Sequence, residues 1–193
     1  MADGILKVGT ITTSSGSGTI TLGQSGETVT IPSGATVSGA MSNTPAFEAF
    51  LSANQSIADN ATDKVLCNTE VFDTNNAYDN STNYRFQPQV AGKYFVYGRT
   101  TLDDGAGAMR QAICYIYKNG SKLLTAKLNF DRSTTSEGEG GTPVCNGIID
   151  MNGSSDYIEL FAELDSNDGG TANVQGNSTE RQSNFGAYKL IGI

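Results

Sequence analysis

Residues 84–94 have the sequence Tyr84-Arg-Phe86-Gln-Pro88-Gln-Val-Ala-Gly92-Lys-Tyr94. Aromatic residues flank a short polar segment that contains a proline and ends in a glycine. Because glycine tolerates turn conformations that other residues avoid, Gly92 predicts a turn between two strands, 84–90 and 93–102. Phe86 and Tyr94 are large side chains on these strands, and we expect both to be buried in the core.

From residue 45 onward the chain continues as short apolar runs separated by turn residues. The further predicted strands are 46–52, 65–72, 110–118, 122–130, 144–150, 157–164 and 183–191. Asn119-Gly120 predicts a tight hairpin, because this dipeptide tolerates positive φ. The segments 136–142 and 166–176 are rich in glycine and polar residues and predict exposed loops. So many short strands predict an all-β sandwich or jelly roll.

The first forty residues differ in composition from the rest. Thr, Ser and Gly make up more than half of residues 1–40, and no Phe or Tyr precedes Phe47. Residues 19–22 and 28–31 nevertheless alternate polar and apolar side chains, which predicts two short strands with a turn between them. Such a pair buries too little apolar surface to be stable alone, so we expect it to become ordered only against a partner. We therefore divide the chain into a β segment, 1–40, and a head, 41–193.

The aromatic motifs of the head resemble a known family. Phe72-Asp73, Tyr78-Asp79, the 84–94 run, Tyr117-Lys-Asn-Gly120 and Phe185-Gly186-Ala-Tyr188-Lys-Leu190 occur in the order found in complement C1q-like globular heads, which are jelly rolls of the tumour-necrosis-factor superfamily. The resemblance implies a homotrimer without catalytic activity. It makes six residues structural: Phe86, Pro88, Gly92, Tyr94, Phe185 and Gly186.

The amino-terminal segment adds a second resemblance. Ile5-Leu-Lys-Val8 and the run 26–36, placed before such a head, are similar to structural proteins of marine tailed bacteriophages. This implies a virion surface protein whose residues 1–40 bind other virion proteins and trimerise while the head projects. A capsid decoration or head fibre is the first expectation, because forty residues provide only a short stalk. The alternative is a short tail fibre or receptor-binding protein that recognises a host surface glycan or protein.

Composition excludes several classes of function. The chain of 193 residues has no His, which removes Ser-His-Asp and Cys-His catalysis and His-ligated zinc. A formal net charge of −8 provides no positive field for nucleic acid. The longest apolar run, 112–117, is too short for a membrane-spanning helix, and the start of the chain shows no secretory signal pattern. We expect a protein that is not an enzyme and that uses no cofactor and no metal.

Three local patterns admit a chemical interpretation. Asp103-Asp104-Gly105 and Asp165-Ser-Asn-Asp168-Gly169 could offer oxygen ligands to calcium, although solvated turns are the more common role of such sequences. Glu159 and Glu163 could be an acid–base pair of a glycosidase, but residues four apart on a strand are about 13 Å from each other, so a solvated face is favoured.

Tyrosines and cysteines complete the candidate residues. Tyr78 and Tyr84 could stack on sugars, and core positions at strand ends are the favoured interpretation. Cys67, Cys114 and Cys145 form an odd set without a CxxC pair, so we expect free thiols in the core.

Overall fold

The computed structural model describes residues 10–11, 18–35, 42–105, 109–130, 138–167 and 169–191. The chain divides into two units, Met1–Val37 and Ser38–Ile193. All secondary structure in the described ranges is β, which confirms the predicted all-β class. None of the described residues belongs to a helix that could cross a membrane.

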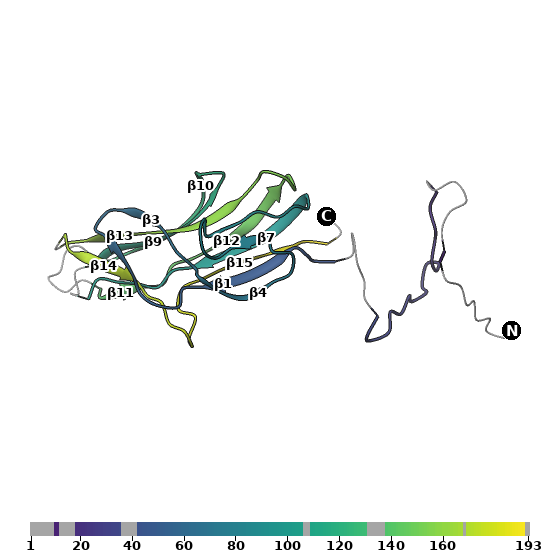
Figure 1. Cartoon of the computed structure of the whole chain (residues 1–193), viewed down its shortest axis with the longest axis horizontal. Coiled ribbons are helices and arrows are strands. Elements are labelled where there is room, and N and C mark those ends of the chain that lie inside the picture. The colour runs from purple at the N-terminus through teal and green to yellow at the C-terminus, as the bar shows by residue number, and fades with distance from the viewer. Residues whose placement is uncertain are drawn as a thin grey trace. The chain divides into compact units, whose positions relative to one another are not determined.

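One layer of the head is a five-stranded antiparallel sheet (Figure 1). Its order is β12 (Val144–Met151), β7 (Gly92–Arg99), β15 (Asn184–Lys189), β1 (Ala46–Phe50) and β4 (Thr69–Asp73). The first and last strands of the head in sequence therefore pair at the centre of this sheet. This pairing closes the head on itself, because β1 and β15 bring its two ends together.

The opposite layer is formed by two further sheets, one of six strands and one of four. The first has the order β10 (Ser121–Asn129), β9 (Met109–Lys118), β13 (Ile158–Ser166), β6 (Arg85–Phe86) and β5 (Tyr78–Asp79), with β3 (Thr62–Lys64) also paired to β13. The second has the order β11 (Gly140–Gly141), β8 (Leu102–Asp103), β14 (Thr171–Val174) and β2 (Gln55–Ala58). The hairpin between β9 and β10 turns through Asn119 and Gly120, both with positive φ, as predicted.

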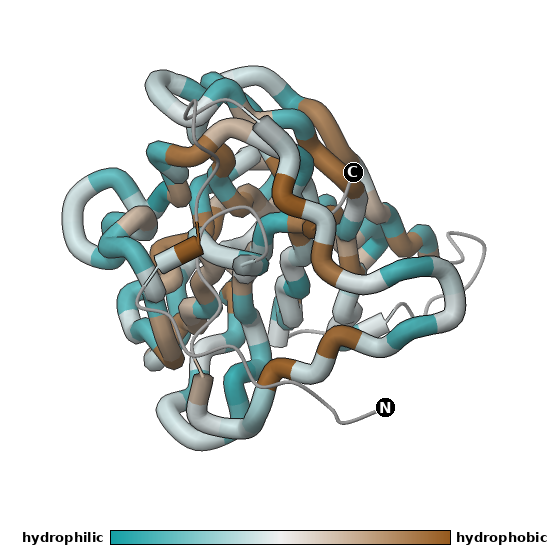
Figure 2. Tube along the Cα trace, turned by 90° about the vertical axis from the view of Figure 1, so that its right-hand side faces the viewer, coloured by the Kyte–Doolittle hydropathy of each residue, from teal (hydrophilic) through white to brown (hydrophobic). Residues whose placement is uncertain are grey.

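The core lies between the layers. Gly98 on β7 faces β13 so closely that a Cβ atom there would overlap Leu160, and the Cys114 Sγ atom would lie 3.8 Å from it. Figure 2 shows hydrophobic and hydrophilic residues interspersed along the chain. On β7 buried positions alternate with half-buried ones, which is the pattern of a strand that turns one face to the core. The three cysteines are free and buried, as predicted. Burial in apolar surroundings raises the pKa of Cys114 to about 12, which keeps this thiol protonated and inert.

The described part of the amino-terminal unit contains no strand in the single chain, and its pairing against a partner stays a prediction. Residues 19–22 and 28–31 form no strands in the single chain, although a turn does lie between them, closed by a hydrogen bond from Glu27 N to Gln24 O of 3.0 Å. All residues from 18 to 35 are exposed. The physical reason is that an isolated pair of short strands buries too little apolar surface to be stable.

The boundaries of several strands differ from prediction. The predicted strand 84–90 is reduced to β6, because Tyr84 has φ of 50° and Pro88 has no N–H for a sheet ladder. The segment 166–176, predicted as an exposed loop, contains β14, in which Ala172 and Val174 are buried. Strands β2, β3 and β5 were not predicted, because two to four residues are too few to show the alternation of apolar and polar residues that identifies a strand.

Candidate functional site

Four aromatic rings meet at the centre of the head. Phe47 of β1 stacks on Phe86 of β6 with ring centroids 4.5 Å apart. Phe185 of β15 contacts Phe47 edge-on, with centroids 5.1 Å apart. Tyr94 contacts Phe86 edge-on at 5.8 Å. All four side chains are completely buried. These predicted motif residues therefore contribute packing rather than chemistry.

The remaining motif residues allow close approach of the backbone or of neighbouring side chains. Pro88 is buried. Gly92 has φ of 149°, and a Cβ atom there would lie 2.8 Å from the Cε atom of Lys189. At Gly186 a Cβ atom would overlap the ring of Tyr97. Glycine is required at position 186 because the tyrosine ring lies directly over its backbone.

An apolar row crosses the outward face of the five-stranded sheet. Phe95 on β7 lies opposite Ile148 on β12 and Tyr188 on β15. The rings of Phe95 and Tyr188 are 5.5 Å apart, and Ile148 and Tyr188 are 59% and 38% exposed. We call Ile148, Phe95 and Tyr188 the aromatic row. Three large side chains in one register row make a contiguous apolar surface, which is typical of a protein contact.

A polar group adjoins the aromatic row on the same face. The Tyr97 hydroxyl donates to Glu48 Oε2 at 3.0 Å, and Arg181 Nη1 lies 3.3 Å from Glu48 Oε1. Burial and the nearby Glu48 carboxylate raise the pKa of Tyr97, so its hydroxyl stays a neutral donor. Arg181 also lies over the ring of Phe50, with its Cζ atom 5.7 Å from the centroid. This face can bind another protein surface through apolar contact and a few directed polar contacts.

The two glutamates of β13 have different environments. Glu163 accepts hydrogen bonds from Thr62 Oγ1 at 2.5 Å and from the Tyr115 hydroxyl at 2.9 Å. Glu159 is only 6% exposed and forms an ion pair of 2.5 Å with Lys64. The prediction of a fully solvated face is therefore wrong at Glu159, because β3 pairs with β13 and Lys64 covers this position. Each carboxylate is held by its own partners, so the two glutamates stabilise the fold and do not form an acid–base pair.

The acidic loops predicted as calcium candidates approach each other at one end of the head. The Asp103 carboxylate accepts from Gly105 N at 2.8 Å and from Gln175 Nε2 at 2.9 Å. Ser166 Oγ lies 3.4 Å from Asp104 Oδ2. Asp168 lies outside the described residues. In the described ranges, no group of three or more His, Cys, Asp and Glu side chains is arranged to hold a metal ion.

The two tyrosines considered as sugar ligands are differently placed. Tyr78 is 5% exposed, stacks on Phe47 at 4.6 Å and donates its hydroxyl to Cys67 O at 2.9 Å. This confirms the core interpretation for Tyr78, whose ring offers no face to a ligand. Tyr84 is half-buried, and its φ of 50° lies in the left-handed region.

Solved structures share this fold. No protein-family model and no curated protein matches the chain. Eiger TNF from S. frugiperda matches with a TM-score of 0.53 at 10% identity, over 77% of this chain and 93% of that chain. The globular domain of zebrafish complement 1qA protein matches with a TM-score of 0.52 at 12% identity, over 78% and 100%. The head therefore has a C1q/TNF-like jelly-roll fold, which confirms the predicted fold at this level.

Apart from Tyr188, which belongs to a quoted motif, the residues of the outward face were not identified from the sequence. The motif residues selected from the sequence are mostly buried, whereas Phe95, Tyr97 and Tyr188 lie beside them in the same strands and point the other way. A signal was present, since residues 93–99 carry aromatic side chains at both odd and even positions. Such a strand is apolar on both faces and requires cover on both.

Proposed function

We propose that the chain is a non-enzymatic bacteriophage virion protein that assembles as a homotrimer and projects from the particle surface as a capsid decoration or head fibre. The aromatic row is the observation that carries this proposal. The fold class agrees with it, because the resemblance in sequence implies a trimeric head. The virion context comes from the similarity of residues 1–40 to phage structural proteins.

The chemistry of the outward face favours association with another protein. Ile148, Phe95 and Tyr188 extend across three strands, and Phe72 on β4 is a further apolar side chain on this sheet, 44% exposed. Covering such surface in an interface stabilises the complex by about 25 cal/mol per Å² of apolar area before the costs of association. Identical copies are the simplest partner, because most oligomers of this kind are symmetric homo-oligomers.

The amino-terminal unit supports a separate attachment role. Ile20, Leu22, Val29 and Ile31 are 42% to 65% exposed, and the only charged residue from 18 to 35 is Glu27. Exposed side chains in a period-two pattern can form strands once another surface is supplied. In this proposal that surface belongs to other virion proteins and to the same segment of the other copies.

Virion incorporation tests the attachment role. Particles are produced with the full chain or with a variant lacking residues 1–40, and head-directed antibodies are counted on purified particles by electron microscopy. The proposal predicts labelling with the full chain and loss of labelling with the truncated chain. Equal labelling of both particles would contradict attachment through residues 1–40, and absence of labelling with the full chain would contradict the virion role.

A further inference from the structure

We propose that a polar cleft beside β5 and β6 binds a neutral saccharide. The cleft has a volume of about 310 Å³, and its lining consists of Ala77, Tyr78 and six polar residues, Asn76, Asp79, Asn83, Arg85, Gln87 and Gln89. This size is within the range of small-molecule sites. The assignment goes beyond the proposed virion role, which does not require a ligand.

The cation in the cleft is largely unused. Arg85 Nη2 donates to Gln87 Oε1 at 3.0 Å, and the guanidinium lies over the ring of Tyr157 with its Cζ atom 4.5 Å from the centroid. Arg85 has no ion pair with a carboxylate of the described residues. Guanidinium has five N–H donors, so several of them can bind hydroxyl oxygens of a ligand.

The carboxylate in the cleft is already satisfied. Asp79 accepts hydrogen bonds from the backbone N–H groups of Ser81, Thr82 and Asn83 at 3.1, 2.9 and 3.1 Å. The Asn83 side-chain amide adds a fourth at 2.7 Å. These bonds lower the pKa of Asp79, so it stays charged and balances Arg85. A cleft with one positive and one negative charge has no electrostatic preference for an anion or a cation, which favours a neutral ligand.

Amide groups provide the remaining contacts. The Asn76 side chain has no hydrogen-bond partner among the described residues. The side-chain amides of Asn83 and Gln89 act only as donors, which leaves both side-chain oxygens free to accept. Each sugar hydroxyl both donates and accepts, and an amide offers the matching pair of functions. The lining therefore suits a polyhydroxylated ring better than an apolar molecule.

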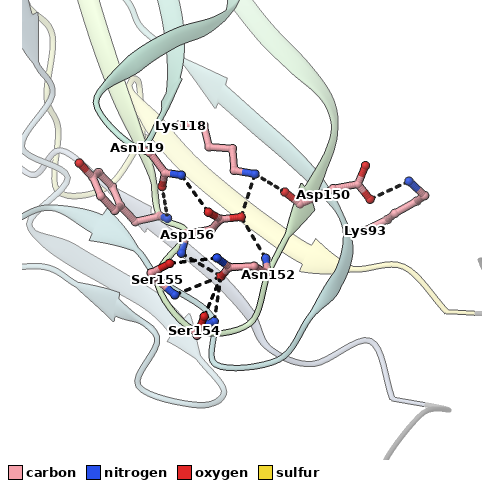
Figure 3. Close-up of polar contacts among 9 residues, drawn as sticks. Lys93, Lys118, Asn119, Asp150, Asn152, Ser154, Ser155 and Asp156 are labelled. Atoms are coloured by element: carbon pink, nitrogen blue, oxygen red, sulfur yellow. Dashed lines mark hydrogen bonds and ion pairs between the residues drawn. The ribbon is translucent and has the colours of Figure 1, made fainter.

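The floor of the cleft is held rigidly by a neighbouring loop. Gln87 Nε2 and Gln89 Nε2 both donate to Ser154 O, at 3.1 and 3.4 Å. Figure 3 shows how this loop is fixed, because Asn152 Oδ1 accepts from the N–H groups of Ser154, Ser155 and Asp156 at 2.9 to 3.0 Å. Groups positioned before binding lose less entropy when the ligand arrives.

A second cleft provides a matched control. It has a volume of about 480 Å³, and its lining includes Asp103, Glu139 and Gln182. Gln182 resembles the amides of the first cleft in chemistry but lies in a different place. Replacing it should leave saccharide binding unchanged.

The test measures binding of methyl glycopyranosides to the intact chain by saturation-transfer NMR. The panel contains the methyl glycosides of glucose, galactose, mannose and N-acetylglucosamine, with methyl glucuronide and inorganic phosphate as charged probes. We expect at least one neutral glycoside to bind with a dissociation constant on the order of 1 mM, as one small subsite allows. Arg85→Met keeps the stem of the side chain and removes the donors, and Asn76→Gly keeps the positive φ. Each should weaken binding about tenfold, whereas Gln182→Ala should not.

Several results would overturn the saccharide site. These are binding by no neutral glycoside, binding by the charged probes alone, equal binding by wild type, Arg85→Met and Asn76→Gly, or equal loss in Gln182→Ala. If Arg85→Met fails to fold, Asn76→Gly decides the question. The mass of each variant in solution is measured in parallel, so that loss of the sugar site is distinguished from loss of assembly.

Discussion

At the scale of single residues, Phe47 is the centre of the core. Its ring contacts Tyr78, Phe86 and Phe185 within 5.1 Å and is completely buried. Phe47→Ala would leave a large cavity among these rings, and we expect a loss of about 3 to 5 kcal/mol in the free energy of unfolding. Leu123→Ala, at an exposed position of β10, is the control, with an expected change below about 1 kcal/mol. Urea unfolding of both variants measures the difference, and equal losses would contradict the central role of Phe47.

Asp156 links the stability of the head to pH. Its carboxylate lies 2.8 Å from Lys118 Nζ and accepts a hydrogen bond of 2.8 Å from Asn119 Nδ2 (Figure 3). These contacts lower its pKa in the folded state. The stabilisation is therefore complete above the unfolded pKa of about 3.9 and is lost as pH falls through the folded pKa.

Asp156→Asn should destabilise the head at pH 7 by about 2 kcal/mol, as expected for hydrogen bonds to a charged group. The difference from wild type should shrink as pH falls below about 4, where the wild-type carboxyl also becomes protonated. Urea midpoints measured between pH 7 and pH 2.5 test both statements. A difference that stays constant over this range would show that the charge of Asp156 does not contribute.

At the scale of elements, the β9–β10 hairpin depends on Asn119 in two ways. The residue has φ of 52°, and its side chain both accepts from Tyr157 N at 2.9 Å and donates to Asp156. Asn119→Gly removes the hydrogen bonds and keeps the turn, whereas Asn119→Ala also places a Cβ atom in the left-handed region. We expect Asn119→Ala to be less stable than Asn119→Gly by about 1 kcal/mol, measured by thermal unfolding. Equal stability of the two variants would contradict this role of the left-handed turn.

The elements also show what sequence pattern can predict. Long strands such as β9, β10, β12 and β13 have enough residues for their apolar positions to be recognised, and the hairpin has a turn dipeptide of its own. Strand β14 was missed because its four residues lie in polar sequence and are defined by pairing with β2 and β8, far away in the chain. The burial of Glu159 was missed for the same reason, since Lys64 reaches it from the unpredicted β3.

The candidate sites were predictable only in part. The aromatic motif identified the strands that carry the outward face. Only the register of β7 with β12 and β15 places Phe95 beside Ile148 and Tyr188. The polar cleft is lined by residues between 76 and 89, and two of its glutamines are held by the backbone oxygen of Ser154. Contacts between residues so far apart in sequence have no local signal, because they arise only when the strands pair.

At the scale of the whole molecule, the proposed function is the assembly of three chains through the outward face of the head. The head is a closed sandwich whose buried face is filled by aromatic rings and whose outward face carries the aromatic row. A formal net charge of −8 on each chain makes copies of the chain repel one another unless they share a specific interface. The proposed association therefore depends on the local apolar surface, and one charge placed in it should prevent assembly.

The most direct test of assembly is the mass of the intact chain in solution, measured by sedimentation equilibrium at micromolar concentration. A homotrimer predicts a wild-type mass of about three times the chain mass of 20.2 kDa. In the absence of the virion proteins against which residues 1–40 are proposed to order, Phe95→Asp should give the mass of one chain, whereas Leu66→Asp, outside the aromatic row, should remain trimeric. A wild-type mass of 20.2 kDa, or a Phe95→Asp variant that stays trimeric, would contradict the central claim.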